Sequence, residues 1–172
     1  MKMLTTQMSG LLQRIAGREE EMIGMTARLL AQATAGEGRV FIAAFGELDA
    51  VSANATLGQE AFRGARRYRG EEIDSTDRVW ILTRSASDEE ALKLARELSE
   101  QFIPFAAVAD EPEDAEDNEL ADLATAYVSL GVKRGLLPSD DGGRTVFPHA
   151  LAALFVYEAV RMDYEELLAE YS

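Results

Sequence analysis

Three continuous apolar stretches place the strongest limit on how this chain folds. They read RVFIAAF (39–45), RVWILT (78–83) and FIPFAAVA (102–109). An apolar stretch without alternation is typical of a parallel strand that is buried on both faces of a sheet. The segment between the second and third stretches, SDEEALKLARELSEQ, has the apolar spacing of an amphipathic helix. Strands that alternate with helices predict an α/β domain with a parallel sheet and right-handed crossovers.

Weaker patterns suggest two further strands and helices at both ends of the chain. TAYVSL (125–130) and the region around Tyr68 are the additional strand candidates. Residues 1–35 have helical spacing that Gly17 interrupts, so we expect two N-terminal helices there. These helices pack either on a second subunit or on their own sheet, and the pattern does not choose between them.

The C-terminal part begins with the loop LLPSDDGGR (136–144) and continues with FPHALAALFVYEAV, a helix in which Pro148 suits the first position. DYEELLAEY then reads as a separate short helix. We therefore expect one domain, made of N-terminal helices (1–35), an α/β core (36–162) and a C-terminal helix (163–172).

Composition excludes several classes of function. The net charge of −14 opposes binding to nucleic acid, because that binding neutralises phosphates with Lys and Arg. The basic stretch FRGARRYRG (62–70) is interpreted as a solvated turn and edge strand. No apolar run is long enough to cross a membrane, no signal peptide is evident, and cysteine is absent. We expect a cytoplasmic protein of the bacterial or archaeal type, with no nucleic-acid or membrane partner.

The acidic stretch DEPEDAEDNELAD (110–122) is a second unusual feature of the composition. Carboxylates suit Mg²⁺ or Ca²⁺, but their spacing here fits no calcium-loop pattern. We interpret the stretch as a solvated loop that leads into a short helix, and we expect no metal site.

Two loops are the candidates for a ligand site. In an open parallel sheet, ligands bind at the carboxyl ends of the strands, where the strand order reverses. FGELDA (45–50) and TRSASDEE (83–90) both follow apolar strands. Thr83, Ser85 and Ser87 can donate hydroxyls to a phosphate, and a helix N-terminus behind them offers free N–H groups. The alternative interpretation is equally good. In it, Ser87 forms a capping box with Glu90, and the other hydroxyls serve only the turn.

The second loop and its surroundings resemble a known family. DRVWILTRSASDEEALKLARELSEQFIPFAAVAD is similar to the second half of a sugar isomerase (SIS) domain, with its Ser-x-Ser-Gly-x-Ser/Thr phosphate loop. In register, Thr83 and Ser85 take the first two hydroxyl positions. Ala86 replaces the glycine of the family, and Asp88 replaces the last hydroxyl. Arg84, between the two hydroxyls, could add a forked donor to a phosphate.

The first loop resembles the same family less closely. GRVFIAAFGELDAVSANA is similar to the opening strand and Gly-x-Gly-x-Ser loop of SIS domains. Ala44 and Gly46 fall on the two glycines, and Leu48 falls on the serine. The nearest patterns are the phosphoheptose-isomerase-like proteins and a small bacterial family of unassigned function that keeps FGE and PHA.

The resemblance implies a fold, a ligand class and an assembly. The fold is a three-layer α-β-α sandwich with a five-stranded parallel sheet of flavodoxin-like order. The ligand is a phosphosugar, no cofactor is needed, and the assembly is a homodimer or homotetramer. We expect a sugar-phosphate-binding protein with phosphosugar isomerase activity of the phosphoheptose type. The alternative is a non-catalytic, oligomeric module that senses a phosphosugar.

An isomerase needs a base and usually an acid near the sugar. The only histidine, His149, begins the last long helix, and related isomerases use a histidine from a late helix together with a glutamate. Glu47 and Glu60 are the catalytic carboxylate candidates, and Asp49 is a third carboxylate near the ligand. Arg144, in a Gly-rich loop, could reach a phosphate or carboxylate. The sequence does not choose among the carboxylates.

Overall fold

The computed structural model describes residues 1–111 and 117–170, and its centre is a five-stranded parallel sheet. The strands lie in the order β2-β1-β3-β4-β5, which confirms the predicted flavodoxin-like order. Their bounds are β1 (Val40–Ala44), β2 (Ala65–Arg67), β3 (Arg78–Ser85), β4 (Phe105–Asp110) and β5 (Ala126–Ser129). The two strands that were weak in the sequence, β2 and β5, are the two edges of the sheet.

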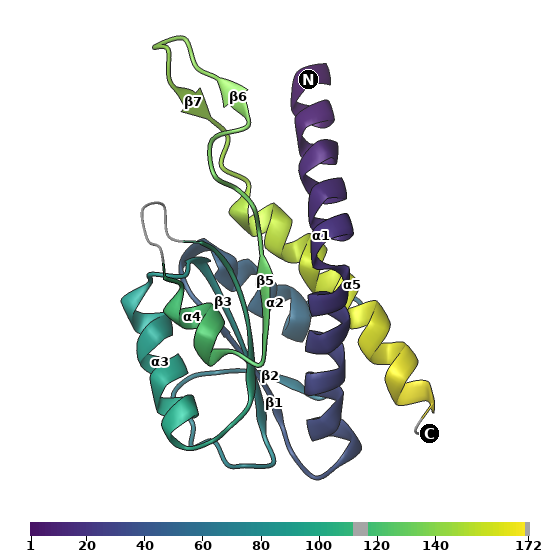
Figure 1. Ribbon diagram of the computed structural model, residues 1–172. Coiled ribbons are helices and arrows are strands. Elements are labelled where there is room, and N and C mark those ends of the chain that lie inside the picture. The colour runs from purple at the N-terminus through teal and green to yellow at the C-terminus, as the bar shows by residue number, and fades with distance from the viewer. Residues whose placement is uncertain (112–116, 171–172) are drawn as a thin grey trace.

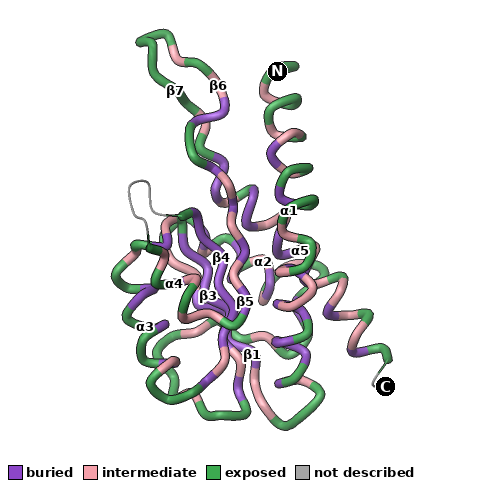
Figure 2. Tube along the Cα trace, in the orientation of Figure 1, coloured by how far each residue is buried: buried purple, intermediate pink, exposed green. Residues whose placement is uncertain are grey.

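Helices cover both faces of the sheet, so the three-layer sandwich is also confirmed (Figure 1). One face is covered by α1 (Lys2–Ala35), α2 (Asp49–Leu57) and α5 (His149–Glu170). The other is covered by α3 (Glu89–Glu100) and α4 (Glu119–Leu123). Successive strand residues enter opposite cores, as Phe41 and Ile42 do, which explains why the strands are apolar throughout. Figure 2 shows this burial concentrated in the central strands.

The terminal helices differ from the prediction, because each is continuous. α1 passes through Gly17 without a break, and a Cβ at that position would meet nothing within 4 Å. One glycine costs a helix only about 1 kcal/mol, which tertiary packing readily offsets. α5 likewise continues to Glu170, because Tyr164 and Leu168 are buried against the core. The separate C-terminal helix was therefore a wrong prediction.

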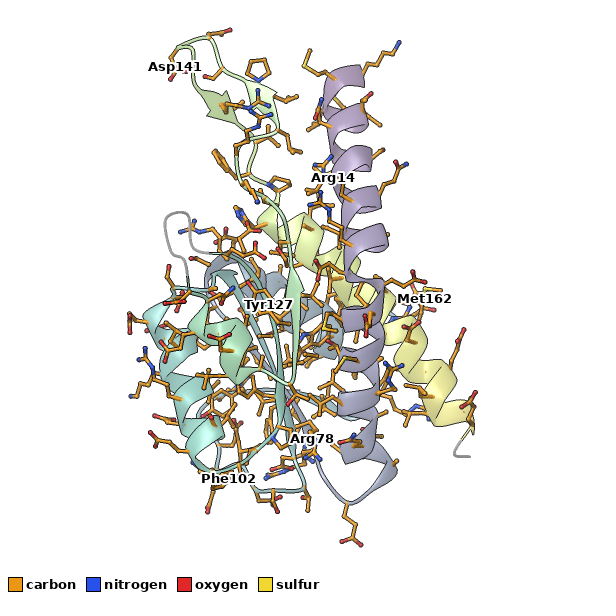
Figure 3. All side chains as sticks on the ribbon, in the orientation of Figure 1. Arg14, Arg78, Phe102, Tyr127, Asp141 and Met162 are labelled. Atoms are coloured by element: carbon orange, nitrogen blue, oxygen red, sulfur yellow. The ribbon has the colours of Figure 1, made fainter. Side chains whose placement is uncertain are left out.

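A hairpin replaces the loop expected at 136–144. β6 (Leu137–Pro138) and β7 (Arg144–Thr145) pair antiparallel and stand off from the body beside the N-terminal part of α1 (Figure 1). Figure 3 shows Asp141 at the hairpin tip and Arg14 on the part of α1 that lies alongside. The rest of α1 packs on its own sheet and on α5. Of the two alternatives for the N-terminal residues, packing on their own sheet is therefore the correct one for that part.

Candidate functional site

The two predicted loops lie side by side at the carboxyl ends of β1 and β3. The Phe45 N–H donates to the Leu82 carbonyl at 2.9 Å, and the 3₁₀ helix η1 (Gly46–Leu48) contacts β3. Across the gap, Glu47 Oε1 is 3.7 Å from Arg84 Nη1. Because β2 and β3 flank β1 on opposite sides, this is the position where the strand order reverses.

Two of the three predicted hydroxyls are available at this rim. The Oγ atoms of Ser85 and Ser87 lie 2.8 Å apart, and the Ser87 N–H donates to Ser85 Oγ at 3.2 Å. Ser85 is half-buried and Ser87 is exposed. Thr83 is 1% exposed, because it lies inside β3, which continues to Ser85. The usable pair is therefore Ser85 and Ser87.

The N-terminus of α3 is capped by Asp88, not by Ser87. Asp88 Oδ1 accepts hydrogen bonds of 3.0 Å from the N–H groups of Glu90 and Ala91. The predicted capping box of Ser87 and Glu90 was therefore wrong: the N-cap is one residue later, and Ala91 cannot complete a box with it. The Asp88 carboxylate therefore accepts from N–H groups that were expected to be free for a phosphate. The Ser87 hydroxyl pairs with Ser85 and does not cap the helix.

The first loop turns one acidic side chain toward β3 and the other away from it. Gly46 has φ +58°, a conformation that favours glycine, and it is exposed. Glu47 follows it and faces Arg84. Asp49 instead forms an ion pair with Arg67 of the edge strand β2. Asp49 therefore lies on the β2 side of β1, whereas the serine pair lies on the β3 side.

His149 contacts an aspartate that the sequence analysis did not select. It is the first residue of α5, with Pro148 just before the helix, and it is 6% exposed. Its Nε2 atom lies 2.8 Å from Oδ2 of Asp110, the last residue of β4, whose Oδ1 accepts the Val132 N–H at 2.9 Å. The sequence did contain a signal for Asp110, because it is an acid that ends an otherwise apolar strand. It was instead interpreted as part of the acidic stretch that follows.

Glu60 and Arg144 have other partners. Glu60 accepts a hydrogen bond of 2.9 Å from Arg161, which is about 18 Å along α5 from His149 at 1.5 Å per residue. Arg144 donates to the carbonyls of Gly135 and Leu136 at the base of the hairpin. Within one chain the structure therefore brings neither side chain to the rim that holds the serine pair.

The described residues hold no evidence of a metal centre. Residues 1–111 and 117–170 contain no group of three or more His, Cys, Asp or Glu side chains arranged to hold an ion. The middle of the acidic stretch, residues 112–116, lies outside the described residues; the residues after it lead into α4, as expected. No helix in the described part of the chain is long and apolar enough to span a bilayer.

The chain has the fold of the SIS-domain sugar isomerases. The Vibrio vulnificus NanR protein complexed with ManNAc-6P superimposes with a TM-score of 0.69 at 16% identity, over 97% of this chain and 62% of that one. This chain therefore spans under two thirds of NanR. Phosphoheptose isomerase GmhA from Neisseria gonorrhoeae superimposes with a TM-score of 0.62 at 9% identity, over 94% of this chain and 95% of that one.

The chain belongs to the family described as a domain of unknown function, DUF2529, whose pattern matches residues 1–168. An uncharacterized protein of Bacillus subtilis, YwjG, is 31% identical over 174 residues, which cover 100% of this chain and 99% of that protein. The predicted resemblance to SIS domains and to a small family of unassigned function is therefore confirmed.

Proposed function

We propose that this protein binds a phosphosugar at the rim formed by the loop of Gly46 and Glu47 and the loop of Ser85 and Ser87. The observation that carries the proposal is the pair of half-buried Ser85 and exposed Ser87 at the point where the strand order reverses. Similar structures support the ligand class, since NanR is complexed with ManNAc-6P and the Neisseria gonorrhoeae protein is a phosphoheptose isomerase. Arg84 supplies the positive charge nearest to the pair in sequence.

The leading version is an aldose–ketose isomerase of the phosphoheptose type. His149 acts as the base and Glu47, on the neighbouring loop, is the carboxylate that lies at the rim. Glu60 can take that role only if a second subunit brings it there, because in its own chain it pairs with Arg161, which is far along α5 from His149. A histidine and a carboxylate together can move a proton between adjacent carbons of a sugar.

The alternative version is a non-catalytic module that senses a phosphosugar. One observation favours it: His149 is almost wholly buried, so a substrate has little access to the imidazole. In either version the proposed assembly is a homodimer or homotetramer, and the proposed location is the bacterial cytoplasm.

A thermal-shift panel of hexose, heptose and amino-sugar phosphates tests the binding proposal. A ligand at 100 times its Kd stabilises the folded protein by about 2.7 kcal/mol, which raises its Tm measurably. The double variant Ser85→Ala, Ser87→Ala should lose the shift. Ser75 is an exposed serine just before β3, at the end of the strand opposite to the proposed site. Ser75→Ala is therefore the matched control and should keep the Tm shift. If no phosphosugar at millimolar concentration raises the Tm, the proposal is wrong.

Turnover separates the two versions. A phosphosugar that binds is incubated with the protein, and interconversion of aldose and ketose is followed by proton NMR. His149→Ala should abolish interconversion and leave the Tm shift in place. Binding without interconversion by the wild type would leave only the sensing module.

A further inference from the structure

Asp110, the last residue of β4, and His149, the first residue of α5, form a buried pair. The Nε2 and Oδ2 atoms lie 2.8 Å apart, and the two side chains are 12% and 8% exposed. Two lone pairs cannot approach so closely in the interior, so the imidazole proton belongs on Nε2. The oxygen lies off the N–H direction, however, and the contact is not an aligned hydrogen bond.

The pair leaves two polar atoms without a hydrogen-bond partner in the described part of the chain. His149 Nδ1 is buried with no partner there, and buried Asp110 Oδ2 has only its misaligned contact with His149 Nε2. Buried acceptors without a donor are costly, and native structures keep few of them, so each one calls for a partner or a functional role. Both atoms are acceptors when the proton is on Nε2, so the group that satisfies them must carry hydrogen. A polyhydroxylated ligand does so.

Asp110 is held on two sides, and one of them is the serine loop. Its Oδ1 atom accepts the Val132 N–H, and its carbonyl accepts the Ala86 N–H at 2.8 Å. Ser85 and Asp110 are paired residues in the register of β3 and β4. The Asp110 carboxylate, which His149 Nε2 contacts, is therefore fixed relative to the hydroxyls that would bind the phosphoryl group.

We propose that Asp110 is the positioning residue for His149: its carboxylate keeps the proton on Nε2 and leaves Nδ1 as the basic nitrogen that faces the ligand. The inference deepens the isomerase proposal and rests on it. In the step that it serves, Nδ1 takes the proton from the carbon beside the carbonyl, and the electron pair of that C–H bond forms the enediolate. The imidazolium produced is stabilised by the Asp110 carboxylate.

The single histidine makes a direct test available. With ¹⁵N-labelled histidine, every imidazole signal of the full chain comes from His149. Long-range ¹H–¹⁵N spectra of the neutral ring should show one tautomer, with the proton on Nε2. Asp110→Asn should give a mixture of tautomers or the Nδ1–H form. Glu111→Gln removes the same charge from the next residue, which contacts Ser129, and should leave the signals unchanged.

Two results would overturn the positioning role: a wild type with the proton on Nδ1, or identical imidazole signals in Asp110→Asn and wild type. If Asp110→Asn fails to fold, the wild-type spectrum is sufficient to test the positioning role. Adding a phosphosugar that turns over gives a second readout, since Asp110→Asn should lower kcat by on the order of 10²-fold and leave KM unchanged. Imidazole signals that depend on Asp110 but respond to no phosphosugar would count against the proposed function and not against the pair.

Discussion

Val146 carries a backbone conformation that a β-branched residue rarely adopts. It has φ +65° at the base of the hairpin, three residues before His149, and its carbonyl accepts the Leu136 N–H at 2.9 Å. Left-handed backbone costs a non-glycine residue about 1–2 kcal/mol, and such strain is concentrated at functional sites. Here it sets the direction in which the chain returns from the hairpin to the start of α5.

A pair of variants measures that strain. Val146→Gly should be more stable than Val146→Ala by about 1 kcal/mol, because both lose the valine packing and only glycine tolerates the positive φ. Urea unfolding gives the two free energies. The same pair at Thr145, in β7, should show the usual order with alanine the more stable. Equal stability of the two variants at 146 would mean that no strain is stored there.

At the level of single residues, sequence reasoning placed two of the three hydroxyls of the candidate site correctly at the strand end, whereas Thr83 is buried. Ser85 and Ser87 were predicted because hydroxyls after an apolar strand must lie at the rim. Asp110 was missed because its partner is distant in sequence, and because an acid before an acidic stretch looks solvated. The partners of Asp49, Glu60 and Arg144 also depend on tertiary contacts, which local patterns do not contain.

The start of α3 is set by Asp88, and its replacement tests both the helix and the site. Asp88→Ala should lower the free energy of unfolding by about 1 kcal/mol, and Asp88→Ser should change it little, because serine also caps helices. Ser87→Ala should be close to neutral in the same unfolding experiment, whereas the capping box would require the reverse order. Asp88→Ser also removes a negative charge beside the serine pair, so phosphosugars should bind it more tightly than they bind the wild type.

An ion pair between the half-buried Arg39 and the buried Asp77 joins the residues just before β1 and β3. The Asp77 carboxylate is 1% exposed and accepts hydrogen bonds from the Arg39 side chain and from the N–H groups of Arg39 and Asp74. Burial by itself would raise the pKa of Asp77, but these hydrogen bonds outweigh burial and lower it. The stabilisation is thus present above the unfolded pKa of about 3.9 and is lost as the pH falls through the lower folded value.

Asp77→Asn should therefore be destabilised by about 2 kcal/mol at pH 7, since charged hydrogen bonds contribute at that level. The difference from the wild type should shrink as the pH falls below about 4. Urea unfolding at a series of pH values measures both effects. Glu72→Gln, an exposed acid in the same loop, is the control and should behave as the wild type does. A difference that is constant with pH would contradict the assignment.

At the level of elements, the sequence predicted every strand of the parallel sheet and placed the helices between them. Continuous apolar strands and an amphipathic α3 leave few alternatives, because each must bury its apolar face. The ends were harder. Whether Gly17 breaks α1, and whether α5 stops near residue 162, depends on what each helix packs against. Tyr164 shows this, since its hydroxyl bonds Thr34 of α1 and the carbonyl of Arg63.

At the scale of the whole molecule, the N-terminal part of α1 projects beyond the sheet (Figure 1). The hairpin contacts one side of this part, and Leu11 and Ile15 are buried there. Closer to the N-terminus Met3 is 59% exposed and Leu4 is half-buried. A helix that extends beyond its own sheet with apolar residues suits contact with a second copy of the chain, as the proposed homodimer or homotetramer requires.

Charges on this part of α1 should therefore dissociate the assembly. The double variant Met3→Glu, Leu4→Glu places carboxylates in the proposed contact, and light scattering after gel filtration should show a smaller species than the wild type forms. Ser9→Glu, Gln13→Glu adds the same charge to polar positions on the face opposite Leu4 and should keep the wild-type mass. If the oligomer also completes the site, the smaller species should lose the phosphosugar-induced Tm shift as well. A wild type that is already monomeric would refute the assembly, and the site would then have to function with residues from one chain.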